Sequence, residues 1–88
     1  MTLEFVDNYI DEKIAKNDEQ IVFTFFELRI KCNLTEEDTD KFLELAKNKF
    51  ENMNYQVFFT GAKYNYNGKN NIVQDNELMI ALKEEQNI

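Results

Sequence analysis

Residues 20–35 read QIVFTFFELRIKCNLT, and this stretch decides the fold that the sequence predicts. Its first four residues are rich in β-branched and aromatic types, which predicts a short strand. Thr24 and Glu27 then form the S/T-x-x-E pattern of a helix start, so a helix should run to about Cys32. Thr35 can cap a further helix after a short turn. The apolar face of the first of these helices should bury Phe25, Leu28 and Cys32.

Apolar residues recur at helical spacing on both sides of this stretch. Residues 3–15 carry one apolar stripe, with Thr2 as a cap, and residues 36–53 carry another. The stripe residues are Leu3, Val6, Tyr9, Ile10 and Ile14 in the first segment, and Phe42, Leu45, Ala46, Phe50 and Met53 in the second. The sequence therefore predicts three helices, of which the last two are separated by a short turn.

Residues 56–82 predict one long β-hairpin. The outgoing strand is rich in aromatic and β-branched residues, and the return strand alternates apolar and other side chains. Between them, Asn67-Gly68 is the preferred pair for a tight hairpin turn. A turn at this pair would set Tyr66 opposite Lys69 at the tip. One continuous register would then place the first strand's Phe59 opposite Asn76.

This order of elements resembles a small prokaryotic winged helix-turn-helix domain. In the resemblance, which covers residues 3–82, residues 24–32 match the first helix of the motif, residues 35–53 match the second, and the hairpin matches the wing. It implies an α+β fold of three helices, a short strand and a long C-terminal β-hairpin wing. It also implies double-stranded DNA binding, often as a homodimer. We expect one domain over residues 1–88, with a frayed tail at residues 83–88.

The charge pattern argues against the usual docking of such a motif on DNA. The chain has a net charge of −7, but residues 21–71 hold seven of its ten basic residues and seven acidic ones. The outer face of the segment 36–53 carries four carboxylates against two lysines, which DNA phosphates should repel. The residues on this face are Glu37, Asp40, Lys41, Glu44, Lys47, Asn48 and Glu51.

The hairpin tip is the better candidate for contact with DNA, because no acidic residue lies between Ala62 and Val73. Lysines pair with phosphates, asparagines bond to base edges or sugars, and tyrosine hydroxyls bond to phosphate. The candidate DNA-binding residues are Lys63, Tyr64, Asn65, Tyr66, Asn67, Lys69, Asn70 and Asn71 at the tip, with Arg29 and Lys31 as additional backbone contacts. This interpretation requires a hairpin that projects from an anionic body.

Two functions remain open at this point. One is a DNA-binding accessory or regulatory protein of a mobile element such as a plasmid or phage, acting in conjugative transfer, partition or transcription control. The other is an acidic protein-interaction module, or a phage-type inhibitor that mimics DNA and binds a basic protein partner. A sequence pI near 4.5 favours the second function. The local neutrality of residues 21–71 favours the first, although asparagine and lysine also suit any solvated turn.

Other classes of function are poorly supported. The chain has no histidine and one cysteine, so we expect no catalysis, no metal site and no cofactor. No apolar run is long enough to cross a bilayer, and Glu4 and Asp7 stand where a signal peptide would carry positive charge. We therefore expect a cytoplasmic protein without membrane contact, in which Cys32 is reduced.

Overall fold

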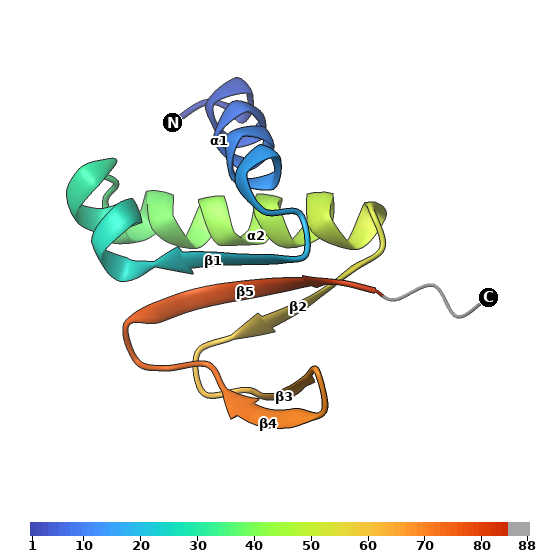
Figure 1. The fold of residues 1–88 in the computed structure, drawn as a ribbon. Coiled ribbons are helices and arrows are strands. Elements are labelled where there is room, and N and C mark those ends of the chain that lie inside the picture. Colours follow the sequence, from blue (N-terminus) through green and yellow to red (C-terminus); the bar gives the residue numbers. More distant parts are fainter. Residues whose placement is uncertain (85–88) are drawn as a thin grey trace.

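The computed structural model describes residues 1–84 of the protein, which form an α+β fold (Figure 1). The helices lie on one side of a three-stranded antiparallel sheet, and a separate two-stranded ribbon lies on the other side. In chain order the elements are α1 (Leu3–Lys16), β1 (Gln20–Thr24), the π-helix η1 (Phe26–Lys31), α2 (Glu36–Asn52), β2 (Tyr55–Phe59), β3 (Lys63–Tyr66), β4 (Lys69–Ile72) and β5 (Glu77–Lys83).

Both threonines that were predicted to cap α-helices do so. At the start of α1, the Thr2 hydroxyl oxygen accepts a hydrogen bond from the Phe5 amide at 3.1 Å. At the start of α2, the Thr35 hydroxyl oxygen accepts one from the Asp38 amide at 3.1 Å. These bonds satisfy amides that have no partner inside their own helix. The predicted positions of both α-helices are thereby confirmed.

The helix predicted between them forms as a short π-helix. Thr24 and Glu27 make the expected reciprocal pair, in which the Thr24 amide donates to Glu27 Oε1 at 2.7 Å and the Glu27 amide donates to Thr24 Oγ1 at 3.2 Å. The turn closes more widely than an α-helix, because the Cys32 amide donates to the Glu27 carbonyl five residues earlier, at 2.9 Å. Leu28 is buried as predicted, but Phe25 is turned outward and 45% exposed. The predicted burial of Phe25 is therefore wrong.

The sheet has the strand order β1-β5-β2, so β5 is the central strand. Phe23 of β1 lies opposite Met79 of β5, which in turn lies opposite Phe59 of β2. Because side chains alternate along a strand, this row faces the helices and the neighbouring row faces the ribbon. The neighbouring row is Val22, Ile80 and Phe58.

The main core lies between the sheet and the helices. Phe23, Phe42 and Phe50 are fully buried, and the Phe23 ring lies 5.4 Å from the Phe42 ring and 6.0 Å from the Phe50 ring, centre to centre. Tyr9 of α1 meets Phe42 edge-on at 5.8 Å. Such pairs add to the stabilisation from burial itself. Aromatic contacts thus join α1, α2 and β1 in one core.

A second, smaller core lies between the sheet and the ribbon β3–β4. Val73, Ile80 and Leu82 are buried there, and the half-buried rings of Tyr64 and Tyr66 pack against them. The ribbon lies beneath β5 as a layer of its own (Figure 1). One of its two faces therefore belongs to the interior of the protein.

This arrangement overturns the predicted long hairpin, and with it the winged helix-turn-helix fold that depended on the hairpin. β2 pairs with β5 in a register that sets Phe59 opposite Met79, and not opposite Asn76. The chain leaves the sheet after β2, forms the ribbon, and returns only at β5. The element order therefore contains two additional strands, which form a separate sheet of their own.

Two turns cause the departure from a continuous hairpin. Gly61 has a φ of 86°, a conformation that glycine adopts without steric cost, and it bends the chain away after β2. On the return path the Gln74 amide donates to the Glu77 carboxylate at 2.9 Å and closes a second turn. The tight turn at the tip is confirmed, with φ values of 53° at Asn67 and 78° at Gly68.

Candidate nucleic-acid interface

The two faces of the ribbon have different surroundings. Lys63 pairs with Ile72 and Asn65 with Asn70, so these side chains share the outer face. All four are exposed to solvent. On the other face, Tyr64 lies opposite Asn71 and Tyr66 lies opposite Lys69. The pairing of Tyr66 with Lys69 is the one that the turn at Asn67-Gly68 predicts. The exposed members of the ribbon include Asn67, Lys69 and Asn71 as well.

The expectation of a projecting hairpin is wrong, because the two tyrosines hold the ribbon against the sheet. The Tyr64 ring lies 5.4 Å from the Phe58 ring, centre to centre. Burial raises the pKa of the Tyr64 hydroxyl above its ordinary value, and the negative charge of Glu77 raises it further. Tyr66 packs on the same small core. Most of the surface of both rings is thus occupied by the protein itself.

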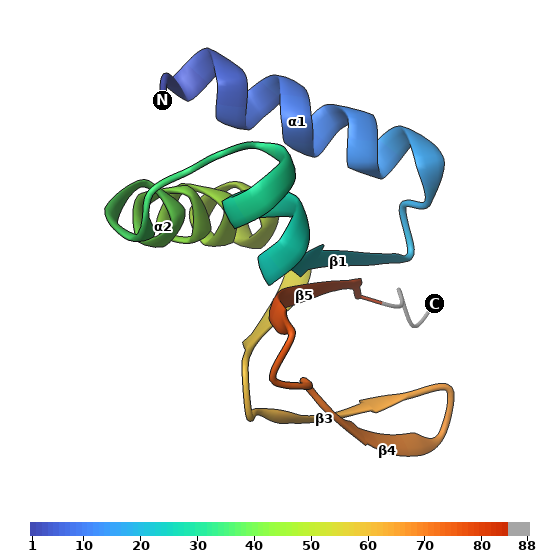
Figure 2. The same ribbon diagram turned by 90° about the vertical axis from the view of Figure 1, so that its left-hand side faces the viewer.

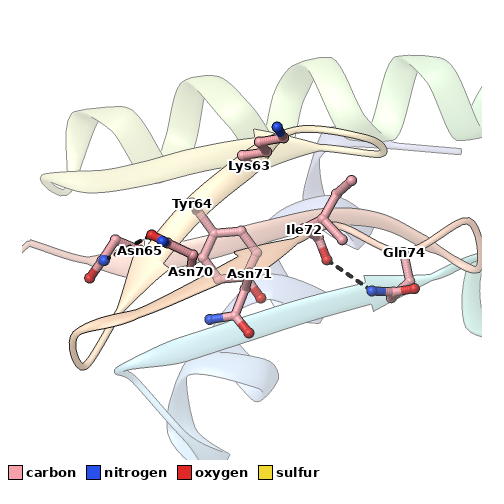
Figure 3. A pocket seen from close by; sticks show the side chains of 7 residues that line it. All are labelled: Lys63, Tyr64, Asn65, Asn70, Asn71, Ile72 and Gln74. Carbon is pink, nitrogen blue, oxygen red and sulfur yellow. Dashed lines mark hydrogen bonds between the residues drawn. The ribbon is translucent and has the colours of Figure 1, made fainter.

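An open groove of about 800 Å³ runs along the ribbon (Figure 3). Side-chain amides dominate its lining and are partly fixed by their own hydrogen bonds. Asn65 Nδ2 donates to Asn70 Oδ1 at 3.2 Å, and Gln74 Nε2 donates to the Ile72 carbonyl at 3.3 Å. No carboxylate of residues 1–84 lines the groove, whose described residues are Lys63, Tyr64, Asn65, Asn70, Asn71, Ile72 and Gln74. The groove therefore offers donors and acceptors without an opposing acidic charge.

The lysines of the ribbon are also free of internal ion pairs. Within residues 1–84, neither Lys63 nor Lys69 lies within ion-pair distance of a carboxylate. Four other lysines are paired, at nitrogen–oxygen distances from 2.7 to 3.8 Å: Lys13, Lys47, Lys49 and Lys83. An anionic ligand can thus meet the ribbon lysines without displacing an acidic partner.

Arg29 and Lys31, the other predicted contacts, lie on η1 beside exposed aromatic rings. The Arg29 guanidinium carbon lies 5.3 Å from the centre of the Phe25 ring, and Arg29 Nε donates to the Leu34 carbonyl at 3.1 Å. Lys31 Nζ lies 5.7 Å from the centre of the Phe26 ring. The sequence predicts the two cations as contacts but not the two exposed rings, because α-helical spacing would place Phe25 on the buried face.

The outer face of α2 is acidic and solvent-facing, as predicted. Glu37, Asp40 and Glu44 are exposed, and within the described part of the chain they have no cationic partner at ion-pair distance. Among residues 1–84, the one ion pair on this face joins Lys47 to Glu51 at 3.8 Å. This surface would repel a phosphate backbone.

A titratable cluster links α1 to the start of η1. The Glu27 carboxylate accepts a hydrogen bond from the Tyr9 hydroxyl at 2.7 Å and forms an ion pair with Lys13 Nζ at 2.7 Å. Lys13 Nζ also donates to the Val22 carbonyl at 2.7 Å, on the edge of β1. Burial raises the pKa of Tyr9 well above its ordinary value, and the hydrogen bond and charge of Glu27 raise it further. The cluster is internally satisfied and serves to join α1, β1 and η1.

This cluster predicts a loss of stability at alkaline pH. The pKa of Tyr9 is higher in the folded protein than its ordinary value of 10.0, so the unfolded chain releases the proton first. The contribution of Tyr9 is fully present below pH 10 and should decline above it, with a slope of at most about 1.4 kcal/mol per pH unit, because one group differs by at most one proton between the folded and unfolded states. Urea unfolding between neutral and alkaline pH should show a shallower decline for Tyr9→Phe. Equal slopes for the two proteins would contradict this role.

Comparison with known proteins assigns no relative: no family model, curated protein or solved structure matches the chain. Over residues 1–84, no helix is long and apolar enough to cross a membrane. The same residues contain no group of three or more acidic or cysteine side chains placed to hold a metal ion. The exposed surfaces of the ribbon, η1 and α2 are therefore the features that bear on function.

Proposed function

We propose that the protein is a cytoplasmic nucleic-acid-binding accessory or regulatory protein that contacts double-stranded DNA through the exposed side chains of its β3–β4 ribbon. Lys63 and Lys69 remain exposed to solvent although the ribbon packs against the sheet and does not project from it. The observation that carries this proposal is the groove that Lys63 and four amide side chains line, without a carboxylate from the described part of the chain. Amides recognise base edges and sugars, while lysines pair with phosphates. Roles in plasmid transfer, partition or transcription control all fit such an activity.

The local charge favours the ribbon, rather than α2, as the surface that binds DNA. Binding of a polyanion depends on the field at the contact, not on the total charge of the protein. Lys63 and Lys69 are exposed cations without an ion-pair partner in residues 1–84, whereas α2 presents unpaired carboxylates such as Glu37 and Glu44. Two lysines give weak contact, so we propose that a homodimer brings two ribbons to one duplex.

The variant Lys63→Ala/Lys69→Ala tests this proposal. Its affinity for a fluorescein-labelled duplex should fall about tenfold or more, because each lysine neutralises a phosphate and releases counterions. Fluorescence anisotropy over a range of salt concentrations should also show a shallower salt dependence, by about one unit of slope per lysine lost in each protomer.

A matched control separates the ribbon from a general charge effect. Lys16→Ala/Lys41→Ala removes the same charge from two exposed lysines that lie on α1 and α2. This control should keep nearly all of the affinity. Equal losses in the two double variants would mean that the ribbon is not the contact surface.

A second function, an acidic module that binds a basic protein, is favoured by one observation. The exposed carboxylates of the first turns of α2 lack cationic partners within the described residues: Glu36, Glu37, Asp40 and Glu44. If this function is correct, the wild-type protein should bind a basic protein in a salt-dependent manner, and Glu37→Gln/Glu44→Gln should abolish that binding. The wild-type protein should not bind duplex DNA. The two proposals thus predict opposite outcomes of the duplex titration.

A further inference from the structure

Three large apolar side chains at the start of η1 and within it are exposed to solvent. Phe25 is 45% exposed, Phe26 57% and Ile30 59%. Large apolar side chains that are exposed together on one short element are candidates for a binding surface. We call Phe25, Phe26, Arg29, Ile30 and Lys31 the η1 surface.

Cations accompany both aromatic rings of the η1 surface. Arg29 lies over Phe25 and Lys31 over Phe26, at the distances given above. Within residues 1–84 neither cation has a carboxylate at ion-pair distance. The acidic residue of this segment, Glu27, is directed inward to Tyr9 and Lys13. The surface is therefore both cationic and aromatic, on a protein whose net charge is −7.

We infer that the η1 surface binds unpaired nucleic-acid bases, which stack on Phe25 and Phe26 while Arg29 and Lys31 hold the adjoining phosphates. The inference rests on the proposed nucleic-acid function and specifies its ligand. Stacking on aromatic rings beside cations is the general way in which proteins hold single strands. Bases inside a duplex are stacked on one another, so only an unpaired base can reach these rings.

The η1 surface and the ribbon lie along one path. η1, the segment between β4 and β5, and the ribbon follow one another on the side of the molecule that faces the viewer in Figure 2. The Phe25 amide donates to the carbonyl of Asn76 at 2.9 Å, and Gln74, two residues earlier, lines the ribbon groove. A nucleic acid held by the ribbon can therefore extend to η1, which suits a duplex with a single-stranded extension.

The test uses the full chain, with Phe26→Ala and Phe26→Leu as variants. The probes are a fluorescein-labelled oligothymidine and a blunt duplex. Phe26→Ala should bind oligothymidine about tenfold more weakly, which is the typical effect of losing one stacked base. Phe26→Leu keeps the apolar area without a planar ring, so it should lose nearly as much. Affinity for the blunt duplex should stay unchanged in both variants, because Phe26 is not part of the ribbon.

The outcomes separate this inference from the proposed function. If the wild-type protein binds the duplex and Phe26→Ala leaves oligothymidine affinity unchanged, the inference is wrong and the ribbon proposal stands. Full oligothymidine binding by Phe26→Leu would likewise exclude stacking. If Phe26→Ala only converts a dimer to a monomer in sedimentation, the η1 surface is a protein interface. Binding of neither probe by the wild-type protein would overturn the proposed function, and the inference with it.

Discussion

Replacing Phe42 by alanine should lower the free energy of unfolding by about 3–5 kcal/mol. Phe42 is fully buried, and its ring meets the rings of Phe5, Tyr9 and Phe23 at centre-to-centre distances of 6.4, 5.8 and 5.4 Å. The substitution removes the apolar area of a whole ring and leaves a cavity between α1, α2 and β1 that close-packed neighbours fill only in part.

An effect of that size is a large share of the stability of a domain this small, which is on the order of 4–13 kcal/mol for its length. Urea unfolding followed by circular dichroism measures the loss of unfolding free energy in Phe42→Ala. Phe26→Ala is the matched control, because its ring is 57% exposed, and its stability should change by only about 0.5 kcal/mol. A similar loss in both variants would contradict the position of the core.

The variant Val73→Asp should detach the ribbon from the sheet at a cost of about 3 kcal/mol. Val73 is buried against Ile80 and Leu82, in a small core of apolar and tyrosine side chains. A carboxylate there either loses its hydration without compensation or forces the ribbon away, which exposes the apolar side chains that it covered. If the ribbon moves away, the loss of stability cannot exceed the free energy that holds the ribbon against the sheet.

The expected signature of Val73→Asp is local. Backbone amides of β3 and β4 should lose protection from hydrogen exchange, whereas those of β1 and β5, which share the main core, should keep theirs. Ile72→Asp is the control, since the neighbouring side chain lies on the outer face and is 45% exposed. If Ile72→Asp destabilised the protein as strongly as Val73→Asp, the two faces of the ribbon would have been assigned wrongly.

The candidate site was only partly foreseeable from the sequence. The absence of acidic residues between Ala62 and Val73 is local information and pointed to the ribbon lysines. The availability of those lysines is not local, because it depends on which carboxylates the fold brings close. Lys49, for example, pairs with Asp7 at 3.3 Å and Asp11 at 3.1 Å, although these partners lie 42 and 38 residues away in the sequence. No pattern of spacing separates such a lysine from Lys63.

Features that depend on a few neighbouring residues were determined by the sequence alone. The caps at Thr2 and Thr35, the Thr24–Glu27 pair and the tight turn at Asn67-Gly68 all use hydrogen bonds or dihedral preferences within four residues. Their energies do not require the rest of the chain to be in place, so the pattern of residue types predicts them correctly.

The tertiary structure alone decided the path of the C-terminal third and the exposure of η1. A continuous hairpin and a sheet with a folded-back ribbon share the tight turn at Asn67-Gly68 and differ in the register of β2 on β5. The second arrangement additionally buries Val73, Ile80 and Leu82 between two layers. Burial of apolar area is non-directional and depends on distant residues, so it can override a local register. The same competition turned Phe25 outward while Leu28 entered the core.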